Sequence, residues 1–211
     1  MTGLIQEFGR MRDLRTFSIV IVALGACASE PVSDPLDDYV EVQATTVLDA
    51  PGVAAADISL EKRQQVNRGE YMVELLGCGT CHTTGALRGE PDARFAMAGS
   101  DVGIAWTTPL QNRNPGVVYP PNITPDADTG IGSWNAEQIA AAIRQGTGRH
   151  GKATSLVMPW PGYARLSDAD TQAIVAYLQS LPPVRHRVPK NVGPGEIATE
   201  PFVYFGIYRS K

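Results

Sequence analysis

Cys78-Gly79-Thr80-Cys81-His82 is the stretch of this sequence that decides both its fold and its chemistry. The two thiols are three residues apart and the imidazole follows directly, so one helical turn places all three side chains on one face. This spacing is the signature of covalent haem attachment. The thiols add to the two vinyl groups of the haem, and the imidazole reaches its iron. We therefore predict that Cys78 and Cys81 bind one haem c and that His82 is an axial ligand.

Two other uses of paired cysteines fit the sequence less well. A thioredoxin-like dithiol follows a strand, and no strand-like run precedes Cys78. A structural zinc site needs further ligands at paired spacing. The third cysteine, Cys27, lies far upstream, and the other histidines, His150 and His186, stand alone. The sequence therefore favours haem over zinc or a disulfide.

Length and charge set outer limits on the protein. The 211 residues can form one medium domain or two small ones. The net charge of −4 indicates no general affinity for nucleic acid. No stretch approaches the roughly 20 apolar residues of a membrane-spanning helix.

The N-terminus has the pattern of a bacterial export signal. Three arginines between residues 10 and 15 precede a short apolar run over 17–24, and Leu24-Gly25-Ala26-Cys27 follows. The last four residues resemble a lipobox, so residues 1–26 are predicted to be a lipoprotein signal peptide and Cys27 the lipidated N-terminus. This would anchor the protein at the periplasmic face of a bacterial membrane. Cleavage as an ordinary signal, which would leave a soluble periplasmic protein, is the alternative.

The rest of the chain divides into three parts. Residues 27–59 are acidic and punctuated by proline, which predicts a flexible tether in which 39–42 could form a short edge strand. Residues 60–184 form the predicted haem domain, and 185–211 a C-terminal extension of irregular structure. Its dense aromatic run is expected to pack on the domain, with a docking role as the alternative.

Three helices and one long loop are predicted within the haem domain. The first helix runs from about Ser59 to Gly77, and Gly69 within it indicates close approach by another element, with a tolerated surface glycine as the alternative. The second covers 135–145. The third is capped by Ser167 and stopped by the proline pair at 182–183. Between the first two, residues 83–133 form a loop long enough to wrap a large flat cofactor.

The sixth iron ligand separates an electron carrier from an enzyme. The candidates are two histidines and three methionines: His150, His186, Met72, Met97 and Met158. Met72 lies in the helix that leads into the haem motif and cannot reach the opposite face. Met97 comes from a segment without rigid support. Met158 stands in a loop just ahead of the last helix, where the chain can return to the haem; its alternative role is a gap-filling core methionine.

Five motifs in a fixed order give the chain a wider resemblance. They are Cys78-Gly79-Thr80-Cys81-His82, Pro121-Asn122-Ile123-Thr124-Pro125-Asp126, Gly130-Ile131-Gly132-Ser133-Trp134, Met158-Pro159-Trp160 and Ala176-Tyr177-Leu178-Gln179-Ser180-Leu181-Pro182-Pro183. Over about residues 62–184 this pattern resembles class I c-type cytochromes, and most of all the haem domains in cytochrome subunits of membrane-linked alcohol and gluconate dehydrogenases. Those subunits usually carry three haem motifs and this chain has one. Relatives often have Tyr where this chain has Trp160.

The resemblance implies a small all-α fold with long haem-wrapping loops, in which the first and last helices cross near Gly69 and Tyr177. It also implies that Met158 is the second axial ligand of the iron. Tyr119, Asn122 and Trp134 would then lie against the haem edge or its propionates.

The expected function is electron transfer by one covalent haem with His/Met ligation, and not catalysis. The expected partners are a dehydrogenase donor and an oxidase or cytochrome acceptor, together with a membrane reached through the lipid on Cys27. The chain could also be an obligate subunit of a larger dehydrogenase. The alternative from another class is a haem enzyme, a peroxidase or small-molecule oxidase with a displaceable sixth ligand.

Overall fold

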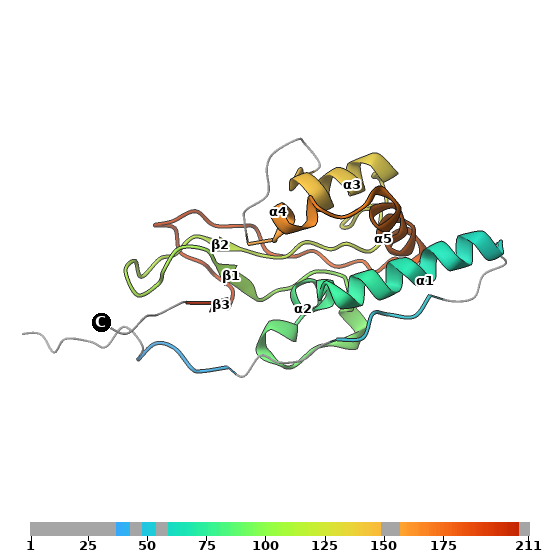
Figure 1. The fold of residues 1–211 in the computed structure, drawn as a ribbon. Helices are drawn as coiled ribbons and strands as arrows, with labels where there is room; N and C mark the ends of the chain where they lie inside the picture. Colours follow the sequence, from blue (N-terminus) through green and yellow to red (C-terminus); the bar gives the residue numbers. More distant parts are fainter. Residues whose placement is uncertain (1–36, 43–47, 54–58, 149–156, 207–211) are drawn as a thin grey trace, which may run out of the picture. The chain divides into compact units, whose positions relative to one another are not determined.

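Figure 1 shows the computed structural model of the chain, which describes residues 37–42, 48–53, 59–148 and 157–206. Its α-helices are α1 (Leu60–Leu75), α2 (Cys78–His82), α3 (Ala136–Gln145), α4 (Trp160–Tyr163) and α5 (Asp168–Ser180). Two 3₁₀ turns, η1 (Ala86–Arg88) and η2 (Ala93–Phe95), and three short strands, β1 (Gly103–Ala105), β2 (Val117–Val118) and β3 (Phe202–Tyr204), complete the described elements. The expected all-α class is confirmed in its main elements, to which the structure adds a small three-stranded sheet. None of the helices in these described ranges is long and apolar enough to cross a membrane.

The three long helices begin where their capping residues predict. Ser59 accepts a hydrogen bond from the backbone N–H of Lys62 at the start of α1, and Ser167 accepts one from Asp170 at the start of α5. Asn135 and Gln138 form a reciprocal capping box on α3. Each cap satisfies backbone donors that would otherwise lack a partner, which fixes where the helix starts.

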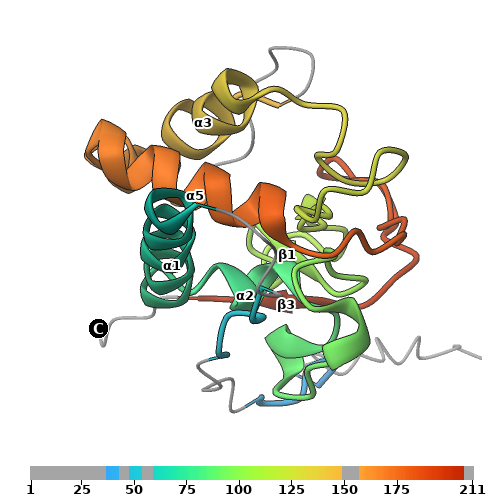
Figure 2. The same ribbon diagram turned by 90° about the vertical axis from the view of Figure 1, so that its right-hand side faces the viewer.

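The core is centred on the crossing of α1 and α5, with α3 packed on the other side of α5 (Figures 1 and 2). A Cβ added to Gly69 would lie 2.0 Å from the carbonyl oxygen of Ala173 and 2.6 Å from Cβ of Tyr177. Only glycine therefore allows the two helix backbones to approach this closely. The predicted crossing at Gly69 and Tyr177 is confirmed.

A three-stranded sheet, which the residue pattern does not predict, connects the long loop with the C-terminal extension. The strand order is β2-β1-β3, with β1 antiparallel to β2 and parallel to β3. Residues Gly103 and Phe202 pair at one end of the parallel register. The extension was expected to be irregular, but β3 and an isolated bridge between Val192 and Val117 tie it to the loop.

The stretch expected to be a free tether also contacts the domain. Ala50 and Val53 pack against the main core, and the carbonyl oxygen of Pro51 accepts a hydrogen bond of 2.7 Å from the hydroxyl of Tyr177. The described part of the packed unit therefore includes residues 48–53, ahead of the boundary expected at residue 60. Residues 39–42, which could have formed a strand, are in irregular structure.

Candidate haem-binding site

The attachment motif forms a helical turn of its own. Gly77 has a left-handed backbone with φ of +66°, which ends α1 and redirects the chain into α2. Cys78 and Cys81 are free thiols. Burial, and to a smaller extent the neighbouring Cys81, raises the pKa of Cys78 to about 12; burial also raises the pKa of Cys81. Both sulfurs are thus reduced and protonated at neutral pH, the form that can add across a vinyl group.

His82 is buried and held by its ring nitrogen. Its Nδ1 lies 2.8 Å from the carbonyl oxygen of Pro121. Because a carbonyl can only accept, Nδ1 carries the proton and Nε2 is the nitrogen with a free lone pair. Burial lowers the pKa of His82, against the opposing effect of the bond to Pro121. The ring is therefore neutral and orientated, as an iron ligand must be.

Met158 lies at the start of the last described segment. It is half-buried, and its carbonyl oxygen accepts a hydrogen bond of 2.8 Å from the backbone N–H of Trp160. Its neighbour Val157 packs in an apolar cluster that also contains Cys81 and Ile104. The loop that carries Met158 and the attachment motif thus share one cluster.

Met97, the competing methionine, occupies a different environment. It is fully buried in the main core, and a Cβ added to Gly79 would lie 3.8 Å from its sulfur. Its backbone has a positive φ of 59°, which is strained for a residue with a side chain. Met97 therefore packs against the attachment turn as a core residue. His150 lies outside the described residues, and Nδ1 of His186 is 2.9 Å from the carbonyl oxygen of Ala98.

The three residues expected at the haem edge are placed differently from one another. Tyr119 is buried beside the extension, and its hydroxyl donates to the carbonyl oxygen of Glu200 at 3.0 Å. Asn122 is only 3% exposed, and its carboxamide is hydrogen-bonded within the protein at both ends. Trp134 packs on the main core, and its indole Nε1 is buried without a hydrogen-bond partner in the described structure. Trp134 thus retains a free donor, whereas Tyr119 and Asn122 have their polar groups paired.

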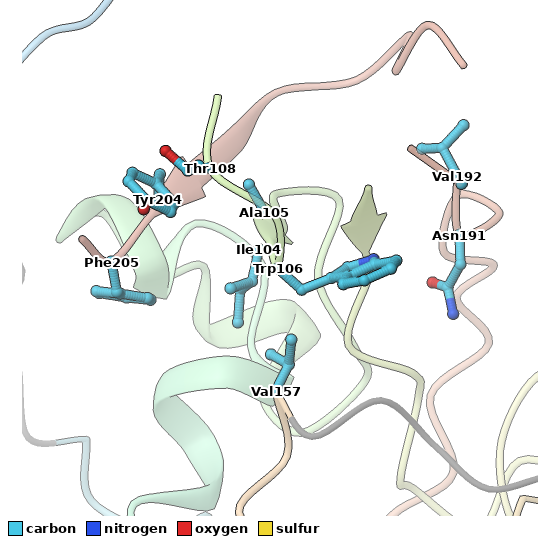
Figure 3. A pocket seen from close by; sticks show the side chains of 10 residues that line it. Ile104, Ala105, Trp106, Thr108, Val157, Asn191, Val192, Tyr204 and Phe205 are labelled. Carbon is cyan, nitrogen blue, oxygen red and sulfur yellow. The ribbon is translucent and has the colours of Figure 1, made fainter. Parts of the chain in front are cut away.

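An apolar cavity of about 950 Å³ is lined by residues of the sheet, of the segment that carries Met158 and of the C-terminal extension (Figure 3). Ile104 and Val157 line it and belong to the same cluster as Cys81. Trp106, Tyr204 and Phe205 form further parts of the wall, and no described residue that lines the cavity is charged. The C-terminal extension therefore forms one side of an apolar cavity, and two residues on the other side of it, Ile104 and Val157, pack in the cluster that contains Cys81.

The residues present suit a covalently bound haem better than a metal ion. Across the described ranges, no group of three or more His, Cys, Asp and Glu side chains is arranged to hold a metal. Two indole donors, Nε1 of Trp134 and Nε1 of Trp160, are buried and unpaired in the same ranges. Buried unpaired donors are costly, and an acidic cofactor would satisfy them. The paired thiols and the orientated neutral imidazole together match the haem.

Two residues contribute to this site without having been predicted from the sequence. The Pro121 carbonyl is a backbone group and leaves no mark on residue type, although it lies in a motif that was singled out. Tyr163 is half-buried, and burial, with smaller effects from Cys78 and Cys81, raises its pKa to about 12. The sequence feature that could have pointed to Tyr163 is its position five residues after Met158.

Comparison with known sequences places the chain in a family. The family model for cytochrome c matches residues 66–182, more than half of the chain and all of α2 and α5. The chain belongs to the cytochrome c family. Like other members it binds haem covalently and carries electrons, and its class I fold agrees with the helical structure described above.

Several relatives of this cytochrome are subunits of dehydrogenases. A nicotinate dehydrogenase subunit of Pseudomonas putida is 34% identical over 141 residues, which are 67% of this chain and 10% of that protein. The cytochrome c subunit of alcohol dehydrogenase (quinone) from Gluconobacter oxydans is 38% identical over 112 residues, 53% of the chain and 20% of the subunit. A diheme cytochrome c-type protein of Cereibacter sphaeroides is 33% identical over 119 residues, 56% of the chain and 37% of that protein. The chain therefore corresponds to only a minor part of each.

Proposed function

We propose that this cytochrome is a mono-haem electron carrier with His82 and Met158 as the axial ligands of its iron. The observation that carries the proposal is the buried, neutral His82, whose Nδ1 proton is engaged by Pro121 directly beside two free thiols. One attachment motif in the sequence supports one haem per chain.

The roles of the residues follow from their chemistry. Sulfur atoms of Cys78 and Cys81 would hold the haem through thioether bonds, and Nε2 of His82 would bind the iron. When bound, the haem supplies an iron that changes between the ferrous and ferric states without any bond being made or broken in the protein. The apolar cluster around Cys81 excludes water from this region. Nε1 of Trp134 and of Trp160 can donate to acidic groups of the haem.

The Met158 thioether completes the coordination in this proposal. A thioether favours ferrous iron and raises the reduction potential relative to a second nitrogen ligand. With both axial positions occupied by protein, the iron has no open site for a substrate. This distinguishes a carrier from the peroxidase or oxidase alternative.

The redox partners are proposed by analogy with the relatives. Three relatives bear the names of nicotinate, alcohol and gluconate dehydrogenase subunits. We propose that a dehydrogenase reduces this cytochrome and that an oxidase or another cytochrome reoxidises it. Contacts of this kind are small and transient unless the chain is a permanent subunit.

Mass and visible spectroscopy of the purified protein test the proposal. We expect a mass increase equal to one haem, and a ferric absorption band in the far-red region that reports an iron–thioether bond. Cys78→Ala or Cys81→Ala should greatly reduce covalent haem, whereas Cys27→Ser is the control that should retain it. A purified chain that carries zinc in place of haem would contradict the proposal, and a spectrum of five-coordinate iron would favour the enzyme alternative.

A further inference from the structure

The carbonyl of Pro121 orientates the His82 ring, so the residues that fix this carbonyl affect the iron ligand. The next residue, Asn122, is 3% exposed. Its Oδ1 accepts hydrogen bonds from the backbone N–H and the hydroxyl of Thr124, at 2.9 and 2.7 Å. These bonds lock the loop immediately after Pro121 into a tight turn.

The other end of the Asn122 carboxamide binds a distant part of the chain. Its Nδ2 donates to the carbonyl oxygen of Val184 at 2.8 Å and to the hydroxyl of Thr129 at 3.0 Å. The backbone N–H of Val184 in turn donates to Thr124 Oγ1 at 3.2 Å. Asn122 thus connects the loop that holds His82 to the segment that follows α5.

The segment that follows α5 also contacts the second part of the chain that is hydrogen-bonded to His82, which is residues 98–99. Nδ1 of His186 lies 2.9 Å from the Ala98 carbonyl oxygen, and the next residue, Gly99, donates its backbone N–H to the carbonyl oxygen of His82 at 2.9 Å. A Cβ added to Gly99 would lie 2.5 Å from Val188 Cγ1. Residues 184–188 therefore pack on both segments that hold His82, and they lie beyond the part matched by the family model.

We propose that Asn122 is a positioning residue that holds the Pro121 carbonyl against His82 and so tunes the reduction potential of the haem. The inference rests on the proposed ligation by His82. Outer-shell hydrogen bonds fix the orientation and basicity of a ligating histidine. Asn122 acts on His82 through Pro121. Both ends of its carboxamide are hydrogen-bonded within the protein, so we assign it this role in place of the haem-edge contact expected from the sequence.

The direction of the effect follows from the charge on the ring. An N–H···O=C bond draws the Nδ1 proton away from the imidazole, which makes the ring a stronger electron donor and favours ferric iron. A looser Pro121 carbonyl weakens this bond, so ferrous iron gains stability and the reduction potential rises.

Asn122→Ala tests the proposal, with the midpoint potential measured by a spectroscopic redox titration. We expect the ferrous-to-ferric ratio at fixed ambient potential to increase by about threefold or more, where tenfold corresponds to 59 mV for one electron. The NMR signal of the His82 Nδ1 proton should shift upfield as its bond weakens. Thr124→Val removes a hydroxyl from the same network, and it should change the midpoint potential and the NMR shift in the same direction by a smaller amount. If Asn122→Ala yields no holoprotein, the Thr124→Val result alone tests the proposal.

Asn135→Ala is the matched control. It removes another asparagine side chain that accepts a backbone N–H, at the N-cap of α3, and should lower thermal stability while leaving both readouts unchanged. Wild-type potential in stable Asn122→Ala and Thr124→Val holoproteins would overturn the inference and limit Asn122 to a structural role, and so would a fall in potential. Neither outcome would affect the electron-carrier proposal, which depends on the wild-type spectrum.

Discussion

At the scale of single residues, the two methionines that compete for the iron differ in their surroundings. Met97 is enclosed in the core behind the attachment turn. Met158 is only half-buried and lies next to Val157, which shares a cluster with Cys81. A ligand must be free to turn toward the iron, and this favours Met158.

Met158→Ala is therefore expected to keep the covalent haem but lose the sixth ligand. The reduction potential should fall by about 100 mV or more, a fraction of the roughly 0.8 V over which axial ligands set haem potentials. The open iron should bind carbon monoxide when ferrous and cyanide when ferric. Met97→Leu is the control, since it removes a sulfur but keeps the volume of a core side chain. The assignment is wrong if carbon monoxide binds to Met97→Leu and not to Met158→Ala.

At the scale of secondary-structure elements, the crossing of α1 and α5 depends on the absence of a Cβ atom at Gly69. Gly69→Ala would place Cβ against the backbone of Ala173, which cannot rotate away as a side chain could. Helix propensity alone would favour alanine by about 1 kcal/mol, but overpacking of a core costs about 1–3 kcal/mol or more. We expect a net loss of about 1 kcal/mol or more in the free energy of unfolding, seen as a lower melting temperature.

Gly162→Ala in α4 is the matched control for this change. A Cβ at Gly162 would meet nothing within 4 Å, so the melting temperature should stay the same or rise slightly. A Gly69→Ala protein as stable as the wild type would show that the two helices can separate without cost.

The Asp170 carboxylate at the start of α5 should make the free energy of unfolding depend on pH in the acid range. Hydrogen bonds from Ser167 and Arg68 lower the pKa of Asp170, and Arg68 also forms an ion pair with it at 2.8 Å. Because the folded pKa is depressed, this stabilisation is present above the unfolded value of about 3.9 and is lost as pH falls through the folded pKa. At pH 6 the wild type should have a higher melting temperature than Asp170→Asn, and this difference in melting temperature should shrink below about pH 4. A difference independent of pH would contradict this.

Residue patterns predicted the three long helices, but not the short α4 or the sheet, for a physical reason. Ser59 and Ser167 each cap a helix by accepting a hydrogen bond from the residue three positions later. Such local pairs can be recognised in the sequence. The parallel pairing of Gly103 with Phe202 joins short strands about 100 residues apart, and nothing local encodes such a partner. The same limit applies at the site: Cys78, Cys81 and His82 are adjacent, whereas the Pro121 carbonyl reaches His82 through the fold.

At the scale of the whole molecule, segments on both sides of the family-matched region contribute to the haem domain. Pro51 accepts a hydrogen bond from the core residue Tyr177, and the extension pairs with β1 through β3. Tyr119 bonds to Glu200 and Asn191 of that extension at 3.0 and 2.8 Å. The C-terminal extension therefore acts as a structural part of the domain, in which Phe202 and Tyr204 are half-buried and Phe205 is exposed.

The location of the cytochrome in the cell depends on N-terminal residues outside the described ranges. We propose that Cys27 is diacylated and anchors the cytochrome at the periplasmic face of a bacterial membrane, because it follows a basic, then apolar, signal-like stretch and a lipobox-like Leu24-Gly25-Ala26. Stable anchoring requires two lipid signals, each buried methylene contributing about 0.8 kcal/mol, and a diacylated cysteine supplies both chains. Tethering would raise the effective concentration of the haem domain near membrane-bound partners.

Cys27→Ser should release the cytochrome into the soluble periplasmic fraction with an unchanged visible spectrum, because the haem ligands lie more than 50 residues away in the sequence. Fractionation of the wild type and the variant, with mass spectrometry of the N-terminal peptide, gives the measurement. Ala26→Ser, which keeps a small residue before the cysteine, is the control and should remain with the membrane. A wild-type protein that is already soluble, begins at Ala28 or later and carries no acyl mass would contradict the anchor and leave the haem chemistry intact, since attachment requires export but not lipidation.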